Sequence, residues 1–345
     1  NPITKEDVFG KEIEVSHLKR IDKLFEKGLH YYLDPKAPEK SKEASVFFRK
    51  QNFQNDELNL GAIKVVNQFE ELKLSLSAIA KLSDLDFKRQ IKKYSISDNP
   101  REIALYPKFD SNRRNFLKSL IGTLASKNIM VFEFIETWNK KDKANIDGFY
   151  LKPNMIVLKR HQSFSREIFT LAHELGHYLL DEEEIEEINY AVFNKNVSAI
   201  EKWCNDFAFF FLAGKFAEAI DSLENASSIN DYHHEFIEKV SYQTHLSKLS
   251  LFTRLLYKGK ISKSNYKLVK EEFEELYRQK QEEKEQEKQL QKEQGIKQRG
   301  SVAKPIASPL FLSTIQTAYY EGVLNEYEVC KKLNIKPEKL ERYIL

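Results

Sequence analysis

The sequence has few cysteines and no long hydrophobic run, and each absence excludes a class of protein. Its two cysteines, Cys204 and Cys330, lie far apart and form no Cys-x-x-Cys pair, which argues against a secreted disulfide scaffold and favours a reducing compartment. The longest apolar run, residues 207–214, is far shorter than the roughly 18 residues that a membrane-spanning helix needs. We therefore expect a cytoplasmic protein without a transmembrane segment.

An excess of charge of one sign is also missing. The 55 Lys and Arg residues nearly balance the 52 Asp and Glu residues, for a net charge of +3, which is too small to indicate a nucleic-acid or membrane partner by itself. The N-terminal residues form no apolar signal core. The first residue is Asn1 rather than Met, so we expect further residues upstream of it.

What the sequence does have is apolar spacing that predicts an α+β, mainly helical fold. The 345 residues, 41% of them hydrophobic, are enough for about two domains with cores of their own. Residues 1 to about 95 show helical spacing and no clear strand alternation. The apolar positions that carry this helical spacing are Val66, Phe69, Leu72, Leu74, Ile79 and Leu82.

Three short runs rich in β-branched and aromatic residues predict strands. They cover residues 129–135, 147–151 and 155–158. A Pro-Asn pair separates the last two at hairpin distance, and proline favours a sheet edge there because it cannot donate to a ladder. We expect a small antiparallel sheet packed on the helix that follows it.

That next helix, predicted over residues 165–180 with Ser165 as its N-cap, contains an H-E-x-x-H pattern. Residues four apart on a helix share one face, so His173 and His177 can bind one zinc ion. Zinc with three protein ligands keeps a position for water and lowers the pKa of that water towards about 7, and a neighbouring carboxylate can then take the proton. The pattern therefore predicts the two histidines as metal ligands and Glu174 as the general base.

A third ligand is expected from a second apolar helix, predicted over residues 198–219. The metzincin extension is excluded, because it requires Gly at 180 and His at 183, where the chain has Leu180 and Glu183. Glu201 on the second helix is the best candidate. The acidic run at 181–187 is the alternative, although such a run more often forms a solvated face.

The residues after Glu201 offer support for a ligand imidazole. Asn205 lies one helical turn beyond Glu201, where it can hydrogen-bond a histidine and fix its tautomer, and Asp206 is its rival for this task. Cys204 is interpreted as a small buried apolar residue rather than a ligand or redox sensor. Gly176 costs about 1 kcal/mol in a helix interior, which predicts a close backbone approach at that position.

The residue that stabilises the oxyanion cannot be chosen from the sequence. The candidates are His233, His234, His245, Tyr178, Tyr190, Arg160 and His161.

Residues 166–180, Arg-Glu-Ile-Phe-Thr-Leu-Ala-His-Glu-Leu-Gly-His-Tyr-Leu-Leu, followed by Glu201-x-x-x-Asn205-x-Phe-Ala, resemble the ImmA/IrrE family of metallo-endopeptidases. Asp147-Gly148-Phe149 and the strand after it resemble the segment that precedes the zinc helix in that family, so the resemblance covers about residues 100–215. It departs from the usual family pattern at Trp203 and Cys204.

The resemblance implies a gluzincin-like zinc peptidase that cuts a partner transcriptional repressor and so relieves repression. It implies His173, His177 and Glu201 as zinc ligands and Glu174 as the base. The expected substrate is a repressor or antitoxin-like regulator of a mobile element or of a stress or defence response. An extended substrate would pair with the strand edge at Gly148 and Phe149.

Two other functions stay open at this point. The first is a non-catalytic, zinc-containing regulator or sensor that binds DNA or a partner protein. The second is a component of a phage-defence or toxin system in which a trigger switches cleavage on. The oligomeric state is not indicated.

Composition and the resemblance together divide the chain into five segments. Residues 246–256 and the C-terminal tail have helix-turn-helix-like spacing, but neither is strongly basic, so DNA binding is only weakly supported. Chains of the family often carry an N-terminal helix-turn-helix before a Phe-Arg pair like Phe48-Arg49. The residues before Phe48 show no convincing helix-turn-helix pattern. The predicted segments are a helical N-terminal region (1–99), a zincin-like metallopeptidase core (100–230), a helical, helix-turn-helix-like segment (231–277), a charged helical spacer or linker (278–309) and a C-terminal helical tail (310–345).

Overall fold

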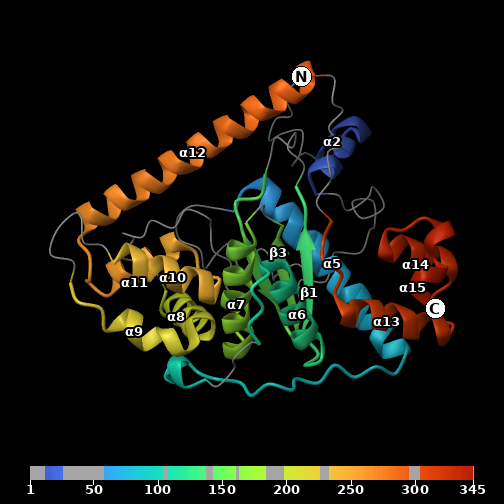
Figure 1. Ribbon diagram of the computed structural model, residues 1–345. Helices are drawn as coiled ribbons and strands as arrows, with labels where there is room; N and C mark the ends of the chain where they lie inside the picture. The colour runs from blue at the N-terminus through green and yellow to red at the C-terminus, as the bar shows by residue number, and fades with distance from the viewer. Residues whose placement is uncertain are drawn as a thin grey trace.

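A small sheet with helices on both faces forms the centre of the molecule (Figure 1). The computed structural model describes residues 12–25, 58–103, 108–136, 143–160, 163–183, 198–225, 233–294 and 304–344. The three strands are β1 (Met130–Phe134), β2 (Gly148–Leu151) and β3 (Met155–Lys159), in the order β1-β3-β2. The α+β, mainly helical fold class is confirmed.

The direction of one strand differs from the expectation. Strands β2 and β3 form the predicted antiparallel hairpin, with Phe149 opposite Val157, but β1 pairs with β3 in parallel, with Phe132 opposite Val157. The sheet is therefore mixed, and the prediction of an antiparallel sheet is wrong for β1. A parallel pair needs a long connection between its strands, and 20 residues lie between the end of β1 and the start of β3.

Alternate residues of the strands feed two separate hydrophobic cores. On β3, Ile156 and Leu158 belong to a core with α6 (Arg113–Ala125) and α7 (Phe164–Leu180). Met155 and Val157 point into a second core with α5 (Leu60–Leu82) and α13 (Pro309–Tyr320). Because both faces of the sheet are covered, the strands are mostly apolar, with Glu133 on β1 and Lys159 at the end of β3 as the charged residues.

The remaining helices flank this centre (Figure 1). Helices α8 (Ala199–Ala213), α9 (Ala217–Asp221), α10 (His234–Thr244) and α11 (Lys248–Tyr257) lie on the side of α7. Helices α14 (Glu326–Leu333) and α15 (Glu341–Ile344) lie at the opposite side of the molecule. The remaining elements are α2 (Val15–Phe25), η1 (Pro100–Glu102), η2 (Gly214–Phe216), α12 (Lys263–Glu293) and η3 (Pro337–Lys339).

The helical region predicted for residues 1 to about 95 extends further than the helix that carries its apolar spacing. Helix α5 ends at Leu82, and residues 85–95 carry no helix. Leu74 and Leu82 are exposed, because the buried face of α5 runs through Phe69, Leu76 and Ile79 instead. Phe48 and Arg49 lie outside the described residues.

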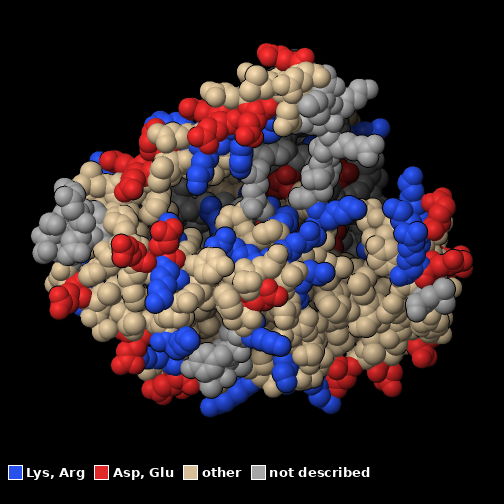
Figure 2. Space-filling model, viewed as in Figure 1, with Lys and Arg blue, Asp and Glu red and all other residues tan. Residues whose placement is uncertain are grey.

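Helix α12 runs along the top of the molecule in Figure 1 and continues without a break across the predicted boundary at 277/278. Residues 278–293 are thus helical, which settles the choice between helix and linker for the part of the spacer that is described. Acidic side chains gather along this helix in Figure 2, and Lys and Arg side chains gather just below it, in the middle of this face.

Among the helices that the structure describes, none combines the length and the apolar character needed to cross a membrane.

The C-terminal tail packs back onto the sheet region. The N–H of Ile306 donates to Oε2 of Glu133 on β1 at 2.6 Å, and α13 then buries Ile315 and Ala318 in the second core. The tail is therefore part of the same packed structure as α5 and the strands.

Candidate metal centre

Helix α7 carries the H-E-x-x-H residues through the middle of the molecule. It begins after Ser163 rather than at Ser165, which is wrong as the predicted N-cap and lies buried inside the first turn. The helix ends at Asp181, which adopts the left-handed conformation with φ of 56°. Its sides are almost wholly buried, so the histidines project into the protein rather than into bulk solvent.

Helix α8 crosses α7 beside these histidines. The hydroxyl of Ser198 accepts from the N–H of Glu201 at 3.1 Å and caps the helix start. At the crossing, a Cβ atom added to Gly176 would lie 3.1 Å from Cα, Cβ and Sγ of Cys204. The close backbone approach predicted for Gly176 is confirmed, and Cys204 is fully buried as its packing partner.

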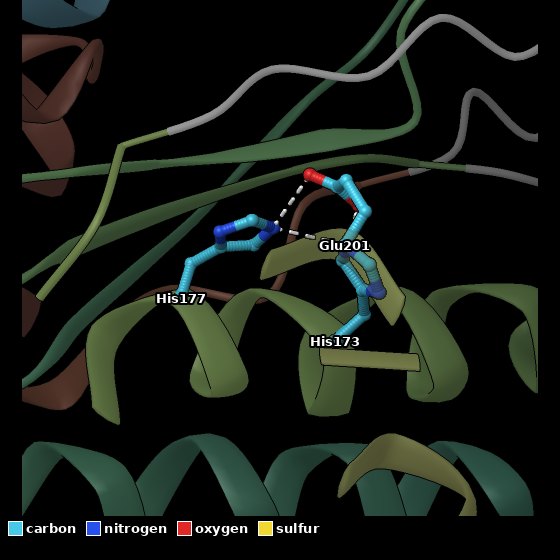
Figure 3. Close-up of side chains that lie close together, drawn as sticks. All are labelled: His173, His177 and Glu201. Atoms are coloured by element: carbon cyan, nitrogen blue, oxygen red, sulfur yellow. Dashed lines mark hydrogen bonds and ion pairs between the residues drawn. The ribbon is translucent and has the colours of Figure 1, made fainter. Parts of the chain in front are cut away.

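Three buried side chains from these two helices point toward one another (Figure 3). Nε2 of His173 lies 3.0 Å from Oε2 of Glu201, and Nε2 of His177 lies 3.1 Å from Oε1. The two Nε2 atoms are 3.1 Å apart. The structure thus brings together the three residues that the sequence analysis named as metal ligands.

These separations fit donors arranged around one metal ion. Ligand atoms at the corners of a tetrahedron with bonds of about 2.0–2.1 Å lie about 3.3 Å apart, close to the three distances observed. Imidazole nitrogens and carboxylate oxygens are also the donors that zinc prefers. A cation among three such facing electron-pair donors would remove the repulsion between them, so the residues present fit a metal ion.

Asn205 orients one of the two imidazoles. With Nδ1 of His173 protonated, it donates to Oδ1 of Asn205 at 3.1 Å, which leaves Nε2 with its lone pair directed at the other donors. Burial alone would raise the pKa of Glu201, but the facing imidazoles of His173 and His177 outweigh it and hold the pKa well below its usual value. A carboxylate ligand binds a metal ion in its charged form.

Glu174 lies next to His173 on the helix but is not one of the three converging residues. Its Oε2 is buried and has no hydrogen-bond partner in the part of the chain that the structure describes. Burial raises the pKa of Glu174 to about 8, while His173 lowers it and Glu201 and Asp147 raise it. A cation held by the neighbouring ligands would lower this pKa again.

Strand β2 passes directly over Glu174. A Cβ atom added to Gly148 would lie 2.6 Å from Cγ2 of Thr170 and 3.4 Å from Cγ of Glu174. Phe149 points to the opposite face of the sheet, where its ring packs edge-on against Phe69. Of the two residues predicted at a substrate edge, Gly148 thus adjoins Glu174 and Phe149 has its side chain in the second core.

Other candidates from the sequence have different partners. Asp206 faces Arg254 in an ion pair. Asp181 pairs with Arg89 and Lys93, and Glu183 accepts from the N–H of Lys152, while residues 184–187 lie outside the described part.

Five of the seven oxyanion candidates make other contacts in the described part of the chain. Arg160 pairs with the buried Glu167. His233 contacts the carbonyl of Glu224, and His234 packs on Phe252. The remaining candidates are Tyr178, whose ring stacks beneath Arg89, His245, which contacts the carbonyl of Asp110, and Tyr190 and His161, which lie outside the described residues.

One contact near the site was not predicted. Nε of Arg166 donates to Oδ2 of Asp147 at 2.6 Å and ties the start of α7 to the start of β2. The two residues are 19 positions apart in the chain, and no short-range pattern indicates their contact.

Comparison with known families agrees with this geometry. Residues 127–217 match the peptidase M78 family, described as an IrrE N-terminal-like domain. The matched segment contains the sheet, α7, α8 and all three converging side chains, and it confirms the resemblance seen in the sequence. No curated protein and no solved structure matches the chain.

Proposed function

We propose that this protein, built around an M78-type peptidase segment, is a zinc-dependent endopeptidase that cleaves a specific protein partner. The observation that carries the proposal is the convergence of two imidazoles and one carboxylate beside a second carboxylate, Glu174, whose Oε2 has no hydrogen-bond partner in the described part of the chain. The family match supports peptidase chemistry. The proposed partner is a transcriptional repressor or antitoxin-like regulator, and the two free buried cysteines support a cytoplasmic site of action.

His173, His177 and Glu201 would hold the zinc ion. When bound, zinc acts as a Lewis acid and lowers the pKa of water at its open position towards about 7. Glu174 takes the proton from the attacking water and passes it to the leaving amine. Its buried oxygen is suited to both steps, because no other described group competes for it.

Strand β2 supplies the proposed surface for an extended substrate. In the described part of the chain it pairs on one side only, with β3. The carbonyl of Asp147 accepts from the N–H of Lys159 at 2.7 Å, and bonding alternates along an antiparallel pair, so the backbone groups of Gly148 and Tyr150 face away from β3. A substrate strand paired there would pass beside Glu174.

Replacing Gly148 by Ala tests this surface. The added Cβ would crowd Thr170 and the carbonyl of Val157, so β2 must shift away from α7. We expect cleavage to fall at least tenfold while zinc content stays at the wild-type level, as measured by metal analysis beside a cleavage assay. Unchanged cleavage would show that substrate does not pair at Gly148.

The function itself is tested with two variants of one purified protein. We expect wild type and Glu174→Gln each to contain about one zinc per chain, whereas Glu201→Gln loses it, because an amide replaces the charged ligand. In cells that express each form, mass spectrometry of new protein N-termini should find cleavage products with wild type. With Glu174→Gln we expect them to fall by roughly 100-fold or more.

The controls separate the competing functions. Zinc binding together with identical N-termini for wild type and Glu174→Gln would favour the non-catalytic zinc-containing regulator that acts by binding DNA or a partner. Absence of zinc from the wild-type protein would overturn the peptidase proposal.

A further inference from the structure

Arg254 on α11 joins two helices beside the metal centre. Its Nε and Nη2 donate to Oδ1 and Oδ2 of Asp221 at 3.0 and 2.9 Å, and its Nη1 donates to Oδ1 of Asp206. The guanidinium also lies 4.2 Å from the centre of the Phe209 ring. The Arg254 side chain is only 6% exposed, and the side chains of Asp206 and Asp221 are 25% and 20% exposed, so these charge-assisted hydrogen bonds are partly shielded from water.

The contact with Asp206 reaches the helix that carries Glu201 and Asn205. A residue in an α-helix advances about 100° around the axis, so Asp206 projects roughly a third of a turn, and Phe209 about a sixth of a turn, away from the face that meets His173. A rotation of α8 about its own axis would therefore move Asp206 and Glu201 together. Whatever holds the Asp206 side of the helix also sets where the Glu201 carboxylate points.

Arg254 suits this task because of its shape. Its planar guanidinium can hold one carboxylate with two parallel hydrogen bonds and still reach a second with Nη1, whereas lysine offers a single point charge. Nε and Nη2 join α11 to α9 through Asp221, and the separate Nη1 joins α11 to α8 through Asp206. Arg254 lies outside residues 127–217, the segment that matches the peptidase family.

We propose that Arg254 is a positioning residue for the metal centre: through Asp206 it fixes the rotation of α8, and so places Glu201 and Asn205 against His173. This inference rests on the proposed function, because it assumes that the three converging residues bind zinc. Under this proposal helix α11, which lies outside the matched segment, helps to set the geometry of the metal site.

The two aspartate partners of Arg254 provide the test. Asp206→Asn weakens the contact with α8, and Asp221→Asn is the matched control because it weakens only the contact with α9. We expect Asp206→Asn to raise the zinc dissociation constant about tenfold, the low end for residues that support a ligand, and to change the absorption spectrum of the cobalt-substituted protein. For Asp221→Asn we expect a zinc dissociation constant within twofold of wild type and an unchanged spectrum.

A stability measurement separates positioning from a purely structural role. We expect both variants to lower the unfolding temperature of the metal-free protein by similar amounts, so that only the metal readouts differ between them. Arg254→Met should reproduce the metal defect of Asp206→Asn; if it does not fold, the two aspartate variants decide alone.

Two results would overturn the inference and leave the proposed function intact. In one, Asp206→Asn binds zinc as wild type does. In the other, both aspartate variants weaken zinc binding equally, which indicates a general loss of structure. A wild-type protein that binds no zinc would overturn the proposed function and this inference together.

Discussion

At the scale of single residues, Gly176 decides how closely the two helices of the metal centre approach. It lies between His173 and His177 on α7, and any side chain there would meet Cys204 on α8. Because Glu201 is one turn before Cys204 on the same helix, a shift of α8 at the crossing also moves the Glu201 carboxylate away from His173 and His177. Helical propensity alone would favour alanine at position 176 by about 1 kcal/mol.

We expect Gly176→Ala to destabilise the protein by about 1–3 kcal/mol, the usual cost of overpacking, and to weaken zinc binding. Chemical denaturation and a chelator competition measure the two effects. Gly122→Ala on α6 is the control, because a Cβ atom there would meet nothing within 4 Å; it should stabilise the protein by roughly 0.5–1 kcal/mol. A stabilising Gly176→Ala would show that the crossing has room for a methyl group.

A single buried histidine, His245, should make the stability of the protein depend on pH. Burial lowers the pKa of this imidazole, although its contact with the Asp110 carbonyl raises it. It stacks on Phe109 and packs against Phe116. In the unfolded chain His245 binds a proton below its usual pKa of about 6.5, whereas in the folded protein its lowered pKa disfavours the protonated form. The contribution of neutral His245 to the free energy of unfolding is therefore complete above about pH 6.5 and is lost as the pH falls below that value.

The measurement compares wild type with His245→Asn, since asparagine tolerates the positive φ of 62° at this position. Between pH 7.5 and pH 5.5 we expect the free energy of unfolding of wild type to fall more steeply than that of the variant. Parallel pH profiles would mean that His245 does not resist protonation.

At the scale of elements, an arginine from the non-helical stretch after α5 braces the C-terminal end of α7. Nη2 of Arg89 donates to the carbonyl of Leu179 at 3.1 Å, and its guanidinium lies 4.0 Å from the centre of the Tyr178 ring. The N–H of Tyr94 donates to the same Leu179 carbonyl at 2.9 Å. The last carbonyls of the metal-site helix are thereby satisfied, and a positive charge meets the negative end of the helix dipole.

We expect Arg89→Met to lower the free energy of unfolding by about 1–3 kcal/mol, since it removes charged hydrogen bonds to partly buried carbonyls. Amide hydrogen exchange should speed up in the last turn of α7. Lys93→Met is the control, because its pair with Asp181 is more than half exposed on the lysine side, and such pairs contribute roughly 0–1 kcal/mol. Equal losses in the two variants would contradict a specific brace.

The elements also show which parts of the fold could be predicted. Helix α7 and the β2–β3 hairpin follow from local apolar spacing and a local turn, and both were predicted within one or two residues of their ends. The parallel pairing of β1 depends on packing between distant segments and has no local signal. Leu74 was misplaced because apolar residues lie on more than one side of α5, and only the partners of Phe69 and Leu76 decide which side is buried.

The candidate site was predicted in the same uneven way. His173, Glu174 and His177 are given by one motif, and Glu201 by its spacing on the next apolar helix. The partner of Asp206 was not predicted, because Arg254 lies 48 positions further along the chain. Contacts of that kind are decided by how helices pack, which the spacing within each helix does not reveal.

At the scale of the whole molecule, the sheet joins two cores that use the same strands. Residues of β3 alternate between the core with α7 and the core with α5 and α13. Neither core can open without exposing one face of the sheet, so we expect the two to unfold together.

Ile315→Ala tests this coupling from the far end of the chain. Ile315 on α13 is fully buried, and we expect its truncation to lower the free energy of unfolding by about 2–5 kcal/mol. Calorimetry should show one transition, shifted as a whole. Leu290→Ala on α12 is the control, since Leu290 is 56% exposed and should change stability by at most roughly 0.5 kcal/mol. A separate early transition for the variant would show that the tail unfolds independently.

The two-sided burial of the sheet also has a consequence for how the protein is made. About 130 residues separate the end of α7 from the start of α13, and a ribosome adds roughly 5–20 residues per second. For about 6 to 26 seconds the emerging chain therefore holds α7 and all three strands, but lacks the tail that completes the second core. During that interval Met155 and Val157 face water or a chaperone on the side that α13 later helps to cover, so the part that would do the chemistry is synthesised well before the part that seals it.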